Sequence, residues 1–170
     1  MSLLRKPHYE GMFQRVLIVV DGSAAGVRAA KFSIMVARRT GAELFAISVV
    51  DTATIRELEL SRIFVEEEGR EYERSLEEDA KKHLHYIASL AESKKCHVET
   101  VLERGSVYGR IVEFAMEKEI DLIVIGGEIG QDRGGARDRA SLEYLRVLRE
   151  ARQSVLFVKN PDVDVDFKKL

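Results

Sequence analysis

Residues 16–51 read VLIVVDGSAAGVRAAKFSIMVARRTGAELFAISVVD, and this stretch decides the fold. Its two apolar runs, 16–20 and 44–50, are continuous rather than alternating, which is typical of strands covered on both faces of a parallel sheet. Between them, Ser23 is placed to cap a helix and Gly41 to end it. Strand, helix and strand therefore predict a right-handed βαβ crossover.

The same alternation continues along the rest of the chain. Strand patterns recur at 97–103, 121–125 and 155–158, with helical patterns before each of them. One helical stripe repeats every three or four positions and predicts a helix packed on the sheet; its members are Tyr72, Leu76, Ala80, Leu84, Ile87 and Ala91. Residues 54–70 are less regular, and either a separate short helix or a mobile arm fits them. Leu142, Leu145, Val147 and Leu148 mark the last helix.

The size and composition of the chain predict one α/β domain. The 170 residues are 45% hydrophobic, enough for a single core, so we expect one domain over 1–170 with its core at about 14–160. We expect a flexible N-terminal flank and a flexible C-terminal tail. The acidic, alternating tail sequence DVDVDFKKL predicts an extended segment rather than a metal site.

Charge and hydropathy exclude several classes of partner. A net charge of −2 provides no basic field for nucleic acid or for an anionic membrane surface. No apolar run approaches the roughly 20 residues of a membrane span, and the N-terminus lacks the features of a signal peptide. We therefore expect a cytoplasmic protein. Cys96 is the single cysteine and is assigned a structural role.

A glycine-rich loop follows the strand at 121–125. Residues 121–141 read DLIVIGGEIGQDRGGARDRAS, and a helical pattern begins near Ala140 or Ser141. Ligands of open α/β sheets lie beyond the carboxyl ends of the strands, and helix N-termini favour anions, so we expect function in this loop. Its arginines either neutralise phosphates or pair with Asp132 and Asp138, and we favour pairing; they are Arg133, Arg137 and Arg139.

Three segments together resemble the universal stress protein family. They are the strand-helix-strand stretch beginning VLIVVDGS, the segment DLIVIGG with its loop, and the final SVLFVKN, in this order across nearly the whole chain. The resemblance implies a three-layer α/β sandwich with a five-stranded parallel sheet of order 3-2-1-4-5, in the adenine nucleotide alpha hydrolase-like (Rossmann-like) class. It also implies a homodimer in which the last strand pairs across the two-fold axis; the edge residues are Val155, Leu156, Phe157 and Val158.

Some members of that family bind ATP through a glycine motif. A glycine, a second glycine after two residues, and a third after nine more, followed by Ser or Thr, hold the phosphates. Here Gly127, Gly130, Ala140 and Ser141 meet this spacing, with alanine in place of the third glycine. In the alternative register Gly126 comes first and Ile129 takes the second position. The nucleotide-binding residues that the resemblance implies are Asp21, Val49, Ile125, Gly126, Gly127, Gly130, Ala140, Ser141 and Leu142. Asp21 has an equally weighted alternative as part of a helix-capping turn with Ser23.

Two functional hypotheses follow. The first is a stress-response homodimer that binds ATP or a related adenine nucleotide, with Mg²⁺, as an occupancy switch for an unknown protein partner. The alternative is a nucleotide-free dimeric interaction module of the same family, which Ala140 and the uncertain register support. Neither is an enzyme with a recognisable catalytic constellation, so at most slow ATP hydrolysis is expected. His83 and His85 lie on different faces of one helix, so no metal site of the protein's own is expected.

Overall fold

The sheet has the architecture that the sequence predicted. The computed structural model describes residues 12–127 and 136–170, with side chains from 12–127 and 141–170. Five parallel strands lie in the order β3-β2-β1-β4-β5, which confirms the predicted order 3-2-1-4-5. The strands are β1 (Arg15–Val19), β2 (Glu43–Val50), β3 (Val98–Arg104), β4 (Leu122–Gly126) and β5 (Ser154–Val158).

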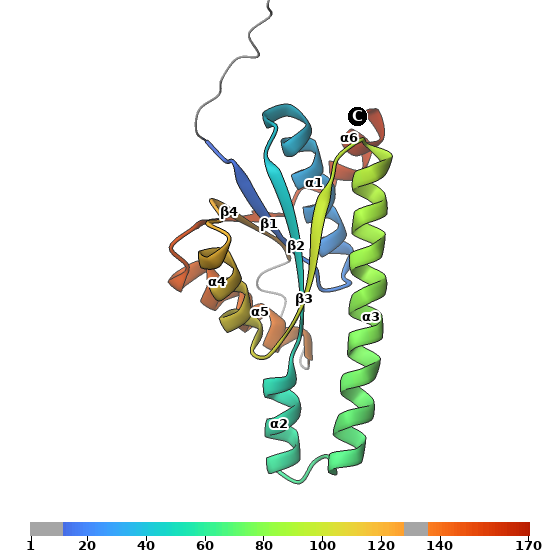
Figure 1. Cartoon of the computed structure of the whole chain (residues 1–170), viewed down its shortest axis with the longest axis vertical. Coiled ribbons are helices and arrows are strands. Elements are labelled where there is room, and N and C mark those ends of the chain that lie inside the picture. The colour runs from blue at the N-terminus through green and yellow to red at the C-terminus, as the bar shows by residue number, and fades with distance from the viewer. Residues whose placement is uncertain (1–11, 128–135) are drawn as a thin grey trace, which may run out of the picture.

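Helices cover both faces of this sheet, which gives three layers (Figure 1). The helices are α1 (Ala24–Thr40), α2 (Thr52–Leu60), α3 (Glu66–Ser93), α4 (Val107–Glu117), α5 (Ala136–Glu150) and α6 (Val163–Lys169). Helices α1, α3 and α6 lie on one face, and α4 and α5 lie on the other. Each face therefore has its own apolar core, which explains why the central strands have continuous apolar runs rather than alternating ones.

Alternate residues of one strand enter different cores. In β1, Val16 and Ile18 pack with α1 and α3, whereas Leu17 packs with α4 and α5. All three side chains are fully buried. Because side chains alternate between the two faces of a strand, each central strand contributes residues to both hydrophobic cores.

Both predicted ends of α1 are confirmed. The Ser23 hydroxyl accepts a hydrogen bond from the Gly26 amide at 2.9 Å. At the other end, Gly41 has φ +77°, the left-handed conformation that glycine adopts without strain. The capped helix returns the chain to start β2 beside β1.

Helix α5 differs from the prediction at its start and on its buried face. Its bounds place Ala140 and Ser141 inside the helix, because α5 begins at Ala136 rather than near Ala140. Among its described side chains, from 141 onward, those that it buries are Tyr144 and Val147. Of the apolar residues that predicted this helix, Leu142 and Leu148 are 64% and 43% exposed.

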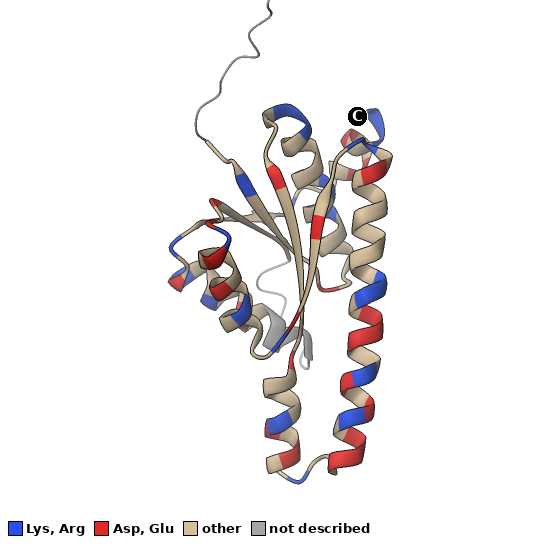
Figure 2. Cartoon of the chain, in the orientation of Figure 1, with Lys and Arg blue, Asp and Glu red and all other residues tan. Residues whose placement is uncertain are grey.

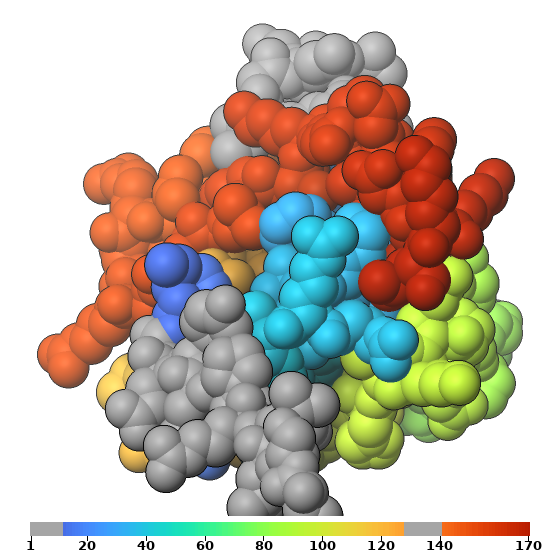
Figure 3. Space-filling view, turned by 90° about the horizontal axis from the view of Figure 1, so that it is seen from above, coloured from blue at the N-terminus to red at the C-terminus, as the bar shows by residue number. Residues whose placement is uncertain are grey.

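The prediction of an extended C-terminal tail is wrong, because residues Val163–Lys169 form α6. Val163 and Phe167, one helical turn apart, are buried against α1. The Phe167 ring lies below the ammonium groups of Lys31 and Lys94, at 5.7 and 4.9 Å from the ring centre. Figure 3 shows α6 seated beside the ends of α1 and α3.

Helix α3 extends past the end of the sheet. Its 28 residues span about 42 Å at the helical rise, whereas the eight residues of β2 span about 26 Å. Helix α2 packs beside the overhanging part of α3, so the two form a hairpin beyond the sheet (Figure 1). Of the two alternatives for residues 54–70, a separate short helix is therefore observed.

Candidate functional site

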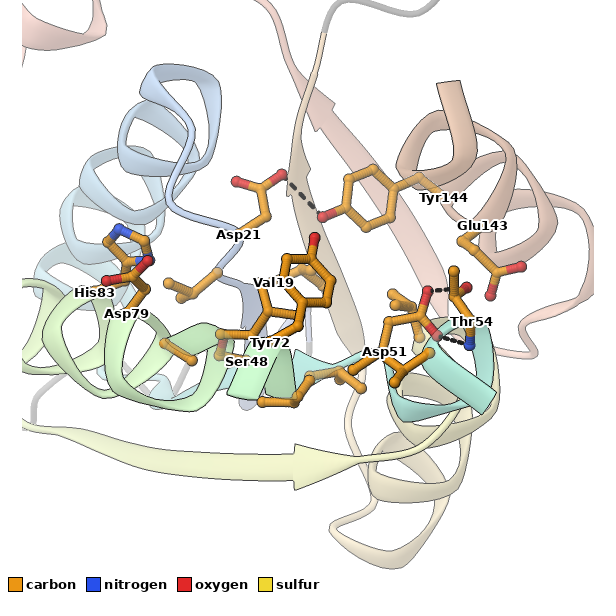
Figure 4. A pocket seen from close by; sticks show the side chains of 17 residues that line it. Val19, Asp21, Ser48, Asp51, Thr54, Tyr72, Asp79, His83, Glu143 and Tyr144 are labelled. Atoms are coloured by element: carbon orange, nitrogen blue, oxygen red, sulfur yellow. Dashed lines mark hydrogen bonds between the residues drawn. The ribbon is translucent and has the colours of Figure 1, made fainter. Parts of the chain in front are cut away.

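A cavity of about 430 Å³ lies where the strands end and the hairpin begins (Figure 4). Its floor is formed by the ends of β1 and β2, and its walls come from α2, α3, α5 and the start of α4. This position, beyond the carboxyl ends of strands, is where open α/β sheets bind ligands, and the volume is that of a small-molecule site. The lining residues are Val19, Val20, Asp21, Ser48, Val49, Val50, Asp51, Thr54, Ile55, Tyr72, Leu76, Asp79, Ala80, His83, Val107, Glu143 and Tyr144.

Asp21 follows β1 and joins two elements across the cavity. One carboxylate oxygen accepts from the Ser23 amide at 2.9 Å and from the Ser23 hydroxyl at 2.6 Å. The other accepts from the Tyr144 hydroxyl of α5 at 2.9 Å. Burial, and then the charge of Asp21 and this hydrogen bond, raise the pKa of the Tyr144 phenol well above its usual value. Tyr144 is therefore a neutral donor that fastens α5 to the end of β1.

Two further carboxylates have similar structural partners. Asp51 follows β2 and accepts from both the amide and the hydroxyl of Thr54, at 3.0 and 2.6 Å, so it caps α2. Glu143 accepts from the Tyr108 amide at 2.8 Å and so ties α5 to α4. These acids hold the walls of the cavity in place.

Helix α3 presents one face to the cavity. Tyr72, Asp79 and His83 recur at helical spacing along this face, and Figure 4 shows all three around the cavity. The His83 ring lies against Gly22, which has φ +76° and no room for a side chain: an added Cβ would lie 2.2 Å from a ring carbon. The turn after β1 thus packs directly on α3.

Ser48 is a polar residue at a core position of β2. Only 5% of it is exposed, its neighbours on the same face of the strand are Ala46 and Val50, and it lines the cavity. Within the described residues its hydroxyl has no hydrogen-bond partner. Because the residue lines the cavity, its hydroxyl has capacity to exchange a hydrogen bond with a ligand there.

The cavity is acidic. Four carboxylates line it, from Asp21, Asp51, Asp79 and Glu143, and no Lys or Arg is among the described lining residues. Acidic residues also gather on the half of α3 that extends past the sheet (Figure 2). Carboxylates only accept hydrogen bonds, so the lining suits hydroxyl and amino groups of a ligand rather than its phosphates.

Only some of the predicted nucleotide-binding residues line the cavity. Asp21 and Val49 line the cavity. Ile125 is 1% exposed in the core against α4 and α5, and Leu142 points to solvent on α5. Gly126 packs on α1, where an added Cβ would lie 1.9 Å from the Ala25 carbonyl oxygen.

The remaining sequence assignments concern the loop and the last strand. Gly127 has nothing within 4 Å of an added Cβ, and Ser141 lies on the second turn of α5. Gly130 and Arg133 lie outside the described residues. Arg137, Arg139 and Ala140, predicted in the loop or at the helix start, belong to α5, and their side chains lie outside the described part of the chain. The residues of the predicted dimer edge lie in β5, an outer strand of the sheet; they are Val155, Leu156, Phe157 and Val158.

Most of the lining was not identified from sequence. Ser48 could have been identified from sequence, because a serine inside an otherwise apolar run of a buried strand indicates a polar site in the core. Tyr72 belonged to the stripe that was assigned to the sheet, where Ala80, Leu84, Ile87 and Ala91 are indeed buried. The role of Tyr144 could not be predicted from sequence, because its hydrogen-bond partner Asp21 is distant in the chain.

Comparison with known proteins identifies the family. The sequence matches the Universal stress protein family over residues 12–159. The chain belongs to the universal stress protein family. It is 32% identical over 163 residues to Universal stress protein MJ0531 of Methanocaldococcus jannaschii, an alignment that covers 89% of this chain and 85% of that protein.

Solved structures of universal stress proteins share the fold, which is the adenine nucleotide alpha hydrolase-like fold. One from Archaeoglobus fulgidus, in complex with dAMP, aligns with a TM-score of 0.58 at 20% identity, over 87% of this chain and 98% of that one. Another, in complex with cAMP, aligns with a TM-score of 0.61 at 19% identity, over 87% and 98% of the two chains. Identity this low supports the shared fold alone.

Neither a membrane-spanning helix nor a metal-binding cluster occurs among the described residues. No helix among them is long and apolar enough to cross a membrane. The same part of the chain contains no group of three or more His, Cys, Asp or Glu side chains placed to hold a metal ion.

Proposed function

We propose that this universal stress protein is a stress-response homodimer that binds an adenine nucleotide, such as ATP with Mg²⁺, in the cavity. The observation that carries the proposal is the position of the cavity, beyond the carboxyl ends of β1 and β2 with Asp21 and Val49 in its lining. The dAMP and cAMP complexes of the structural neighbours agree with this class of ligand. Occupancy of the cavity then biases the binding of a protein partner in the cytoplasm.

The nucleotide is expected to act as a ligand rather than a substrate. Asp21, Asp51 and Glu143 each accept hydrogen bonds from protein donors, so none of them is free to serve as a general base. Of the other titratable lining residues, Asp79 accepts from Lys82 at 3.4 Å and the His83 ring packs against Gly22. We therefore expect any hydrolysis of ATP to be slow.

The position of β5 at the edge of the sheet supports the proposed dimer. An outer strand with apolar residues along its length is prone to pair with a second strand. Light scattering of the purified protein should give twice the protomer mass, and a protomer mass at tens of micromolar protein would contradict the dimer.

One specific observation favours the nucleotide-free alternative. Asp21, the residue expected to meet adenosine, already accepts three hydrogen bonds from Ser23 and Tyr144. A carboxylate has about four acceptor sites, so little capacity remains for a ligand. In that case the cavity acids are purely structural and the protein is a dimeric interaction module.

The deciding experiment measures bound nucleotide directly. Freshly purified protein is denatured and the released small molecules are identified by mass spectrometry, and the stripped protein is titrated by calorimetry with ATP and Mg²⁺, AMP and cAMP. Release of an adenine nucleotide, or saturable binding below millimolar concentration, supports the proposal. An empty protein that binds none of the three refutes it and leaves the interaction module.

A further inference from the structure

The cavity has two walls that differ in chemistry. On one side, Asp21, Asp51 and Glu143 are held by donors of the protein itself. On the other side lie Ser48 of β2 and Tyr72 of α3, whose hydroxyl groups have no hydrogen-bond partner in the described part of the chain. Groups that are free to meet a ligand thus concentrate between β2 and α3.

Tyr72 is an aromatic residue in an unusual place. It lies where α3 has passed the end of the sheet, so it covers no strand, and 44% of it is exposed. Its ring is held edge-to-face by Phe64, with ring centres 5.7 Å apart and planes at 71°. Figure 4 shows the ring reaching into the middle of the cavity. The ring is therefore positioned by one aromatic neighbour and leaves a surface open to the cavity.

Ser48 of β2 supplies a polar group to the same side of the cavity as Tyr72. The side chains of Ser48 and Ala80, which line this part of the cavity from β2 and α3, are small and leave space between the two elements. Ser48 is only 5% exposed. A flat ligand that enters here meets an aromatic ring on one side and a single hydrogen-bonding group at its edge.

We infer that Ser48 and Tyr72 form the subsite for a purine-like aromatic ring, which stacks on Tyr72 and receives or donates one hydrogen bond at Ser48. This inference rests on the proposed nucleotide-binding function and names the residues that select its ligand. The ring is bound by α3 and β2, the sugar hydroxyls face the carboxylates, and phosphates stay outside the acidic cavity. Specificity for the base thus resides in the overhang of α3 and not in the glycine loop.

The test is calorimetric titration with AMP and with ribose 5-phosphate, which lacks the ring. Loss of one base–aromatic stack in Tyr72→Ala should weaken AMP binding by about 5- to 150-fold, whereas Tyr72→Phe keeps the ring and the affinity. Ser48→Ala should weaken AMP binding by about 2- to 12-fold. Neither substitution should change binding of ribose 5-phosphate. Tyr86→Ala is the matched control, because Tyr86 is a tyrosine of α3 with 48% exposure that does not line the cavity.

A second measurement on the unaltered protein avoids any effect of substitution on folding. Tyr72 and Tyr86 are almost equally exposed, so tetranitromethane should nitrate both in the free protein. With saturating AMP, peptide mass spectrometry should show protection of Tyr72 and none of Tyr86. Equal nitration with and without AMP would overturn the subsite.

The outcomes separate this inference from the proposed function. If the unaltered protein binds AMP and Tyr72→Ala binds it equally well, the subsite is wrong and nucleotide binding stands. If binding of AMP and of ribose 5-phosphate weakens together in Tyr72→Ala, the side chain only supports the hairpin, and the subsite is again wrong. If the unaltered protein binds no adenine nucleotide, both fail.

Discussion

Tyr144 provides the sharpest test of how the cavity is held together. The side chain is 7% exposed, its ring packs in the core against α4 and the sheet, and its hydroxyl donates to Asp21 at 2.9 Å. Tyr144→Phe removes only the hydroxyl. A hydrogen bond to a charged acceptor contributes about 1.5–3 kcal/mol, but Asp21 is exposed and water can replace the lost donor. We therefore expect a loss near the low end, about 1–2 kcal/mol.

The matched comparison is Tyr144→Ala, which also removes the ring. Truncation of a buried aromatic side chain costs about 3–5 kcal/mol, so this variant should be clearly the less stable of the two. Denaturant unfolding gives both values, and a double-mutant cycle of Tyr144→Phe with Asp21→Ala, which removes the acceptor, isolates the pair. Equal losses for Tyr144→Phe and Tyr144→Ala, or strictly additive effects in the cycle, would refute the assignment of a hydrogen bond between α5 and β1.

The same pair predicts a dependence on alkaline pH. The pKa of Tyr144 is raised in the folded protein, so the folded state holds this proton more tightly than the unfolded state. The resulting stability is complete below the unfolded pKa of about 10 and is lost as pH rises through the folded pKa, at up to about 1.4 kcal/mol per pH unit. Unfolding free energies at pH 9 and pH 11 should therefore fall more for the unaltered protein than for Tyr144→Phe. Absorbance at 295 nm should show a tyrosine of the unaltered protein that ionises well above the usual pKa of about 10 and that is missing from Tyr144→Phe. Identical titration curves for the two proteins would contradict the burial of this hydroxyl.

Two further predictions concern packing away from the cavity. Gly126→Ala should lower the unfolding free energy by about 1–3 kcal/mol, because its Cβ would meet the backbone of Ala25, whereas Gly127→Ala has open space and should leave stability unchanged in thermal denaturation. Phe167→Ala should cost about 3–5 kcal/mol, because α6 buries this ring on α1, whereas Val165→Ala on the exposed face of α6 should cost under about 0.5 kcal/mol. Equal melting temperatures within either pair would contradict the packing described.

The sheet could be predicted from sequence because its signals are local. Continuous apolar runs indicate buried parallel strands, and Ser23 and Gly41 mark the ends of α1 by mechanisms that involve only neighbouring residues. The order of the strands came from the resemblance to a family and is confirmed by the pairing of β1 with both β2 and β4.

The C-terminal helix could not be predicted because its sequence fits two periods. In DVDVDF the residues Val163, Val165 and Phe167 alternate as in a strand, but Val163 and Phe167 are also one helical turn apart. The choice depends on α1 and α3, which provide the apolar surface and the two lysines around Phe167. Tertiary contacts of this kind are not visible in a local pattern.

The cavity was missed for a related reason. The stripe that includes Tyr72 and Leu84 is regular along α3, and nothing in its period shows where the sheet beneath it ends. Helix α3 is longer than β2, so the first part of the stripe lies beyond the sheet. Its residues there line the cavity and do not pack in the core. The same is true of Tyr144, whose partner Asp21 is 123 positions away.

The proposed nucleotide site has two separate parts, one for the phosphates and one for the base. Asp21 takes part in a capping turn with Ser23 and is also tied to α5, so its first role is to shape the cavity. The motif concerns phosphates, whereas the open groups of the cavity, on Ser48 and Tyr72, suit a base. If the proposed subsite is correct, the alanine at position 140 is expected to change the affinity for phosphates and not the affinity for the base. We then expect the protein to bind adenosine even where its affinity for ATP is low, and the ratio of the two affinities, measured by calorimetry, tests this expectation.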